Sequence, residues 1–121
     1  LTDKEYLDAV ETCRKYSREE GIHQVVGENK LDAIVAPSNA PTWMIDLVSG
    51  DCGSGYVGSS SLAAVAGYPN ITVPAGFVKE LPLGISFFGK AFTEHTLIKL
   101  AYSFEQAAKT RRQPKFLPTA A

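Results

Sequence analysis

Residues 59–76 constrain the fold of this chain more than any other segment, because they combine a helix, a sharp break and a strand. The segment opens on serines that can cap a helix, and small and apolar residues follow them. Gly67 and Pro69 interrupt that helix, and a β-branched run then suits a buried strand. This order predicts a helix over 60–66 and a strand over 71–74.

Apolar spacing near the N-terminus predicts more helix. Capping boxes, in which a hydroxyl residue is followed three positions later by Glu, begin at Thr2 and at Ser17. Apolar residues recur at helical spacing after each box. We expect helices over 3–16 and 18–29, formed either as two consecutive helices or as one helix bent near Ser17.

Short apolar runs predict the remaining strands. The run 33–36 ends at Pro37 and lies between two helices, so we expect a parallel strand there. The short connection between 71–74 and the run 84–88 instead favours an antiparallel hairpin. Apolar residues spaced by three and four predict a last helix over 94–110. The expected fold class is therefore α/β, a mixed sheet flanked by helices in one domain of 121 residues.

Composition and charge exclude several classes of function. Twelve basic and thirteen acidic residues give a net charge of -1, which indicates neither nucleic acid nor an acidic membrane surface as a partner. No apolar run approaches the roughly 18 residues that span a bilayer. Cys13 and Cys52 are too few for a disulfide framework and lack a metal-ligand spacing. We expect no metal, no cofactor and a reducing, cytoplasmic setting. The chain starts at Leu1 without a methionine, which suggests a cut or processed piece.

The chain also carries a series of motifs: a strand followed by a proline turn, a Gly-Tyr-Pro turn, a Val-Pro-Ala-Gly segment and a Leu-Pro-Leu-Gly segment. They occupy 31–38, 66–69, 73–76 and 81–89, and Glu105-Gln106 closes the set. In order and spacing they resemble the C-terminal half of amidase-signature hydrolases. The resemblance implies that residues 1–121 are the C-terminal portion of that fold and that the whole enzyme hydrolyses carboxylic amides.

The same resemblance implies an acyl-enzyme reaction in which one serine attacks the carbonyl, a second serine relays its proton and a lysine acts as base. In the family these groups lie in an earlier, Gly- and Ser-rich region, so we expect no catalytic residue in this chain. Residues 59–61 superficially resemble the nucleophile segment, but Val57 and Leu62 depart from its pattern and no base lysine precedes it at the family's spacing. We interpret these serines as a helix start. A thiolate of Cys52 activated by a histidine is an alternative that no recognisable motif supports.

Residues 37–56 are the least regular part of the chain and carry many apolar side chains. An ordered functional loop, or a surface that meets other chain, fits this composition better than a solvent loop does. The resemblance implies that this region approaches the acyl side of the substrate pocket. Trp43, Met44 and Tyr56 are therefore candidate substrate-binding residues, and the alternative is that they pack against a neighbouring segment.

A layer taken from a larger sheet leaves a strand edge and an apolar patch exposed. We expect the patch to include some of Trp43, Met44, Ile45 and Val48. Either the missing N-terminal half of an amidase or a second copy, most simply in a homodimer, would cover it. A hypothesis of another class is a free-standing binding or self-association domain that reuses the amidase tail.

Overall fold

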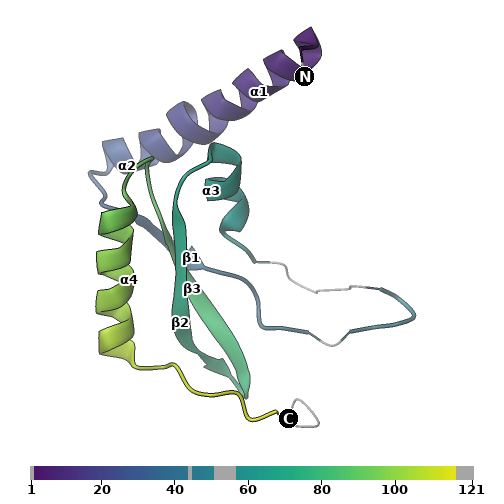
Figure 1. The fold of residues 1–121 in the computed structure, drawn as a ribbon, viewed down its shortest axis with the longest axis vertical. Coiled ribbons are helices and arrows are strands. Elements are labelled where there is room, and N and C mark those ends of the chain that lie inside the picture. The colour runs from purple at the N-terminus through teal and green to yellow at the C-terminus, as the bar shows by residue number, and fades with distance from the viewer. Residues whose placement is uncertain (1, 44, 51–56, 117–121) are drawn as a thin grey trace.

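The part of the chain that the structure describes folds into a three-stranded sheet with helices on both of its faces (Figure 1). The computed structural model describes residues 2–43, 45–50 and 57–116. The sheet has the order β1-β3-β2 and is made of β1 (Ile34–Pro37), β2 (Asn70–Val78) and β3 (Leu81–Phe88). This arrangement confirms the expected α/β class of a small sheet flanked by helices.

The expectation of a parallel first strand, and with it of a mixed sheet, is wrong for the described part of the chain. β1 and β2 both pair with β3, and both pairings are antiparallel. β1 and β2 run in the same direction, but they are not neighbours because β3 lies between them. The hairpin reverses the chain after β2, so β3 pairs with β2 along one edge and with β1 along the other.

The hairpin between β2 and β3 turns tightly. Only Lys79 and Glu80 separate the strands, and Lys79 adopts the left-handed backbone that such short turns require, with φ of 55°. The register shifts between Pro74 and Gly76, which places a β-bulge at Ala75. A bulge of this kind bends the strand and increases its twist.

The N-terminal helices form one bent helical rod made of α1 (Lys4–Arg14), the π-helical η1 (Lys15–His23) and α2 (Gln24–Glu28). The two interpretations were two consecutive helices or one helix bent near Ser17; the structure has two helices that meet at a kink four residues later, at Gly21, whose φ and ψ of -119° and -109° are not helical. A Cβ atom at this position would lie 2.5 Å from the carbonyl oxygen of Tyr16, so only glycine fits. Neither predicted cap forms: the helix begins after Asp3, and Ser17 Oγ is buried without a partner among the described residues.

Helix α3 (Ser60–Ala66) confirms the helix and the break expected from the central segment. Gly67 adopts φ of 67°, and the N–H groups of Gly67 and Tyr68 donate to the carbonyl oxygens of Ala64 and Ala63 at 3.1 and 2.9 Å. This pair of hydrogen bonds is the Schellman motif, which satisfies the last carbonyls of a helix. The serine hydroxyl before the helix makes no capping hydrogen bond.

Helix α4 (Glu94–Ala108) confirms the last predicted helix to within two residues. It packs on β2 and β3, burying Leu97 and Ala101, and the rings of Phe104 and Phe87 pack edge to face at a centroid distance of 6.0 Å. Within the described ranges, no helix combines the length and apolar character that a membrane crossing needs.

Neighbouring residues of β3 serve opposite faces of the sheet, because strand side chains alternate. Phe87 faces α4, whereas Phe88 is 1% exposed in the core on the opposite face. That core joins η1, α2 and α3 to the sheet. It consists of Ile22, Val26, Ala63, Ala66 and Phe88, with Ile34, Ala36 and Tyr68 packed against it.

Candidate functional site

The chain segment that follows β1 contains the residues for which a binding role is expected. Trp43 lies there with 40% of its surface exposed. Met44 and Tyr56 lie outside the described residues, so the grouping of these three side chains around a substrate stays a prediction.

An acid-capped turn follows in the same segment. The Oδ1 atom of Asp46 accepts hydrogen bonds from the N–H groups of Val48 and Ser49 at 2.8 and 3.0 Å. The N–H group of Gly50 closes the turn on the Asp46 carbonyl oxygen at 3.1 Å. The bonds from the backbone of Ser49 and then of Val48, with one from the Ser49 side chain, lower the pKa of Asp46, because they stabilise its charged form. These hydrogen bonds give the turn a defined conformation. Ile45, Leu47 and Val48 in it are almost fully exposed to solvent.

A cluster of three hydroxyl groups anchors the start of this segment to the sheet. Ser86 of β3 is 2% exposed, and its Oγ atom lies 2.7 Å from Ser38 Oγ and 2.8 Å from Thr72 Oγ1. Ser38 also donates to Thr72 at 3.2 Å. The three hydroxyls satisfy one another between β2, β3 and the residue that directly follows β1, which fixes the position where the segment leaves the sheet.

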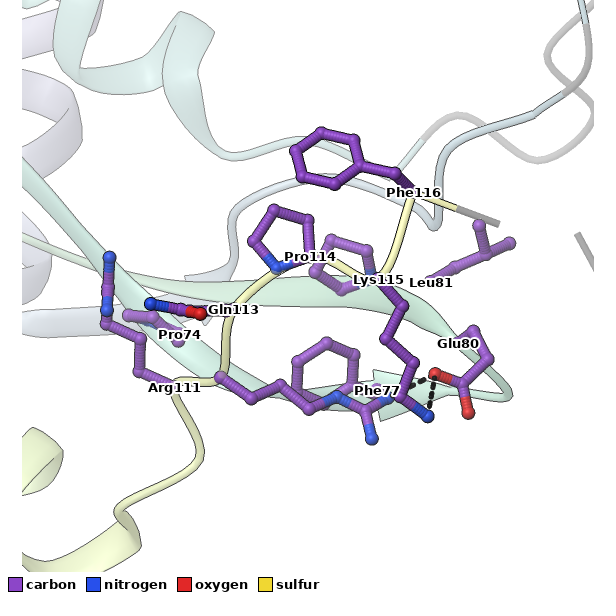
Figure 2. Close-up of a pocket in the computed structure, with 11 residues that line it drawn as sticks. Pro74, Phe77, Glu80, Leu81, Arg111, Gln113, Pro114, Lys115 and Phe116 are labelled. Atoms are coloured by element: carbon purple, nitrogen blue, oxygen red, sulfur yellow. Dashed lines mark hydrogen bonds and ion pairs between the residues drawn. The ribbon is translucent and has the colours of Figure 1, made fainter. Parts of the chain in front are cut away.

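A groove of about 500 Å³ lies between the hairpin and the chain that follows α4 (Figure 2). Phe77, Leu81 and Pro114 are among its apolar lining residues. Glu80 forms ion pairs with Arg112 and with Lys115, both at 3.2 Å. Since these groups are partly exposed, each pair contributes little by itself. Residues 111–116 form one wall of the groove, and the two ion pairs hold this tail against the hairpin.

A third polar cluster secures the Gly-Tyr-Pro turn. Arg18 donates from Nε to the carbonyl oxygen of Ala66 at 2.7 Å, at the end of α3, and its guanidinium lies 5.5 Å from the centroid of the Tyr68 ring. The Tyr68 hydroxyl is 2.7 Å from His23 Nε2, and the two rings stack. These contacts explain why the turn carries a tyrosine: it links η1 to α3.

Candidate nucleophiles and bases stay apart in the part of the chain that the structure describes. Ser59 is 3% exposed at the start of α3, and its Oγ atom has no hydrogen-bond partner there. His23 bonds to Tyr68, and His95 lies exposed on α4. No group of three His, Cys, Asp or Glu side chains in this part could hold a metal ion. Cys52 lies outside the described residues.

Sequence reasoning missed the hydroxyl cluster and the contact between the tail and the hairpin. The cluster joins residues 48 positions apart, Ser38 and Ser86, and becomes visible only when the strand register is known. The tail carried one usable signal, since Arg112 and Lys115 lie beyond the expected helix end and could pair with an acidic turn. That signal does not identify Glu80 as the partner.

Comparisons with known proteins agree on one group of enzymes. A probable amidase of Arabidopsis thaliana is 41% identical over 110 residues, which cover 90% of this chain and 18% of that protein. One chain of the glutamyl-tRNA(Gln) amidotransferase of Methanosarcina mazei is 32% identical over 93% of this chain and 24% of its own length. The peptide amidase of Stenotrophomonas maltophilia has a TM-score of 0.84 and 40% identity, over 96% of this chain and 23% of that chain. No protein-family model matches the chain.

The fold is an α/β layer. Its polar clusters connect the strands to one another, η1 to the turn after α3, and the tail to the hairpin. The chain belongs to the amidase-signature family and corresponds to a portion of its members. This confirms the resemblance seen in the motifs. It spans about a fifth of the length of the curated relatives it matches.

Proposed function

We propose that this chain supplies scaffold and part of the substrate-pocket wall to an enzyme that hydrolyses carboxylic amides, and that it is catalytically silent by itself. One observation carries the proposal: the fold follows a solved peptide amidase at a TM-score of 0.84 over 96% of this chain and only 23% of that chain. A layer that matches so closely serves the same structural purpose, while most of such an enzyme lies beyond the matched part.

In the whole enzyme, a serine attacks the amide carbonyl and forms an acyl-enzyme, while a second serine and a lysine move its proton. Backbone N–H groups stabilise the oxyanion that develops. The resemblance assigns these groups to another region of the family's sequence. The hydroxyl of Ser59 is buried and has no hydrogen-bond partner among the described residues, which supports this assignment, because a nucleophile needs a base within hydrogen-bond reach.

Trp43, Met44 and Tyr56 remain the residues that we propose for the pocket wall. The acid-capped turn at Asp46 supports an ordered arrangement after Trp43. The proposed partner is the remaining portion of an amidase chain or, in its absence, a second copy of this chain. The proposed setting is cytoplasmic, in keeping with the free, exposed thiol of Cys13.

An assay of the 121-residue chain against simple aryl amides and esters tests the proposal. We expect no turnover from the chain, and the same background from a Ser60→Ala variant. Turnover that Ser60→Ala abolishes, while the neighbouring Ser61→Ala preserves it, would overturn catalytic silence and our interpretation of the serines as a helix start.

A self-association domain is the second candidate, and a specific observation favours it. Ile45, Leu47 and Val48 are 84%, 94% and 95% exposed on an ordered turn, which is unusual for a chain that acts alone. A coding sequence that continues upstream into a Gly- and Ser-rich segment with a lysine would favour the amidase portion over this candidate.

A further inference from the structure

The groove between the hairpin and the tail has room for a small molecule. Its volume of about 500 Å³ lies within the range of about 300–1,000 Å³ that ligand pockets occupy. Apolar side chains line it from both walls: Pro74, Phe77, Leu81, Pro82, Pro114 and Phe116. Phe116 is 89% exposed although it lines the groove, so a ligand there would cover apolar surface that now faces water. Burial of this surface favours a ligand with an apolar body.

The charged side chains of the groove do not balance one another. Among the described residues that line it are three cations, Arg111, Arg112 and Lys115, and the carboxylate of Glu80. Arg112 and Lys115 both bind Oε2 of that carboxylate, each at 3.2 Å. Arg111 forms no hydrogen bond or ion pair within the described ranges. The lining therefore keeps positive charge that an anionic ligand can neutralise.

Contacts on either side hold the backbone of Arg111 in place. The hydroxyl of Thr110 donates to the carbonyl oxygen of Pro74 at 2.7 Å. The guanidinium carbon of Arg112 lies 3.6 Å from the centroid of the Phe77 ring. Arg111 thus lies between two anchored neighbours, while its own side chain has no partner in the described part of the chain. A binding group on an ordered backbone loses less entropy when a ligand arrives.

The unpaired donors lie at one end of the groove. Figure 2 shows Arg111 and Gln113 at the end away from Glu80, with the ring of Phe77 between the two ends. A guanidinium offers two parallel N–H donors that match a carboxylate, and the amide of Gln113 can donate a further hydrogen bond. The apolar lining continues from there past Phe77. This arrangement suits a molecule with a carboxylate at one end and an apolar body at the other.

We propose that this groove binds a small amphipathic carboxylate, an aryl or alkyl carboxylic acid in its ionised form, with the carboxylate on Arg111 and the apolar body along Phe77 and Phe116. A carboxylate fits better than a phosphate, because one guanidinium is unpaired and a second negative charge would lie against apolar side chains. Trp43, the described residue of the proposed pocket wall, does not line this groove. The inference therefore does not depend on the proposed function.

Titration of the 121-residue chain with 4-phenylbutyrate, followed by ¹H–¹⁵N NMR, tests the site. We expect saturable shifts in the backbone amides of residues 111–116, with a dissociation constant at or below about 1 mM. The neutral analogue 4-phenylbutyramide should bind at least about tenfold more weakly, because it leaves the charge of Arg111 unpaired. Inorganic phosphate has no apolar body and should not displace the acid.

Variants matched in charge separate a specific contact from a general effect of charge. Arg111→Gln should weaken binding of the acid at least about tenfold, while the circular dichroism melt stays at that of the parent. Arg14→Gln is the matched control, since Arg14 is exposed on α1 and does not line the groove, and it should leave binding unchanged. Phe116→Ala should weaken binding several-fold, because it removes apolar surface that the ligand covers.

Other outcomes would overturn parts of the proposal. No saturation below about 10 mM overturns the site as a whole. Equal weakening by Arg111→Gln and Arg14→Gln, or an amide that binds as tightly as the acid, overturns the carboxylate contact. Displacement of the acid by inorganic phosphate, or unchanged binding in Phe116→Ala, overturns the role of the apolar body.

Discussion

The guanidinium carbon of Arg112 lies 3.6 Å from the centroid of the Phe77 ring, and the same side chain pairs with Glu80 at 3.2 Å. Arg112 belongs to the tail after α4, whereas Phe77 and Glu80 belong to the hairpin end. One cation thus holds two segments together through the face of an aromatic ring and a carboxylate. Arg111 beside it has no hydrogen bond or ion pair among the described residues, and Figure 2 shows it directed away from Glu80.

Arg112→Ala should release the tail from the hairpin. An exposed cation–π contact and a surface ion pair together contribute about 1 kcal/mol, and both are lost. Backbone order in residues 111–116, measured by the ¹⁵N heteronuclear NOE, should fall. Arg111→Ala is the matched control and should leave that order unchanged. Equal loss of order in the two variants would show that the tail is not held through Arg112.

Ser86→Ala should destabilise the sheet by about 1–2 kcal/mol, because it removes the buried hydroxyl that bridges Ser38 and Thr72. Urea unfolding followed by circular dichroism measures the change. Ser103→Ala on the exposed side of α4 is the control, which we expect to be neutral or slightly stabilising. A neutral Ser86→Ala would mean that the cluster adds nothing to stability.

Gly84→Ala should cost about 1–3 kcal/mol through overpacking. A Cβ atom there would lie 2.8 Å from both Ser38 Oγ and Thr72 Cγ2, which are themselves held by the hydroxyl cluster. At Gly76 of the neighbouring strand, nothing lies within 4 Å of the same added atom, so Gly76→Ala should be tolerated. The two melting temperatures, measured under one condition, decide between crowding and a general cost of alanine.

The turn at Asp46 should keep its conformation when the solution is made acidic, down to a pH below the ordinary pKa of an aspartate. Because its folded pKa is lowered from the ordinary 3.8, the carboxylate stabilises the turn above the unfolded pKa, and this contribution disappears as the pH falls through the folded value. The amide proton shifts of Val48 and Ser49 should therefore titrate with a midpoint below 3.8. In Asp46→Asn, which cannot titrate, the transition should vanish. A midpoint at or above 3.8 would contradict the assigned hydrogen bonds.

Local patterns in the sequence were sufficient where the structure depends on local forces. The Ala-rich segment and Gly67 predicted α3 and its end, because a left-handed residue that closes a helix is a local requirement. The cap predicted at Ser17 failed because Ser17 lies inside η1, and the kink comes four residues later at Gly21, where a Cβ atom would lie 2.5 Å from the Tyr16 carbonyl oxygen.

Pairing between distant segments was beyond local patterns. An apolar run such as Ile34–Pro37 predicts a strand, but the partner of that strand depends on which edge of the hairpin is free once the hairpin has formed. Of the candidate pocket, Trp43 is described and exposed, and its role depends on groups that only a larger assembly would supply.

The central position of β3 in the sheet also determines the order in which the strands pair during folding. The β2–β3 hairpin closes over a two-residue turn, whereas β1 must find its place across a loop that separates Ser38 from Ser86 by 48 positions. Closing so long a loop costs more entropy than closing a hairpin, so we expect β1 to dock last and to detach first. The three-stranded sheet is therefore complete only in molecules whose β2–β3 hairpin has already formed.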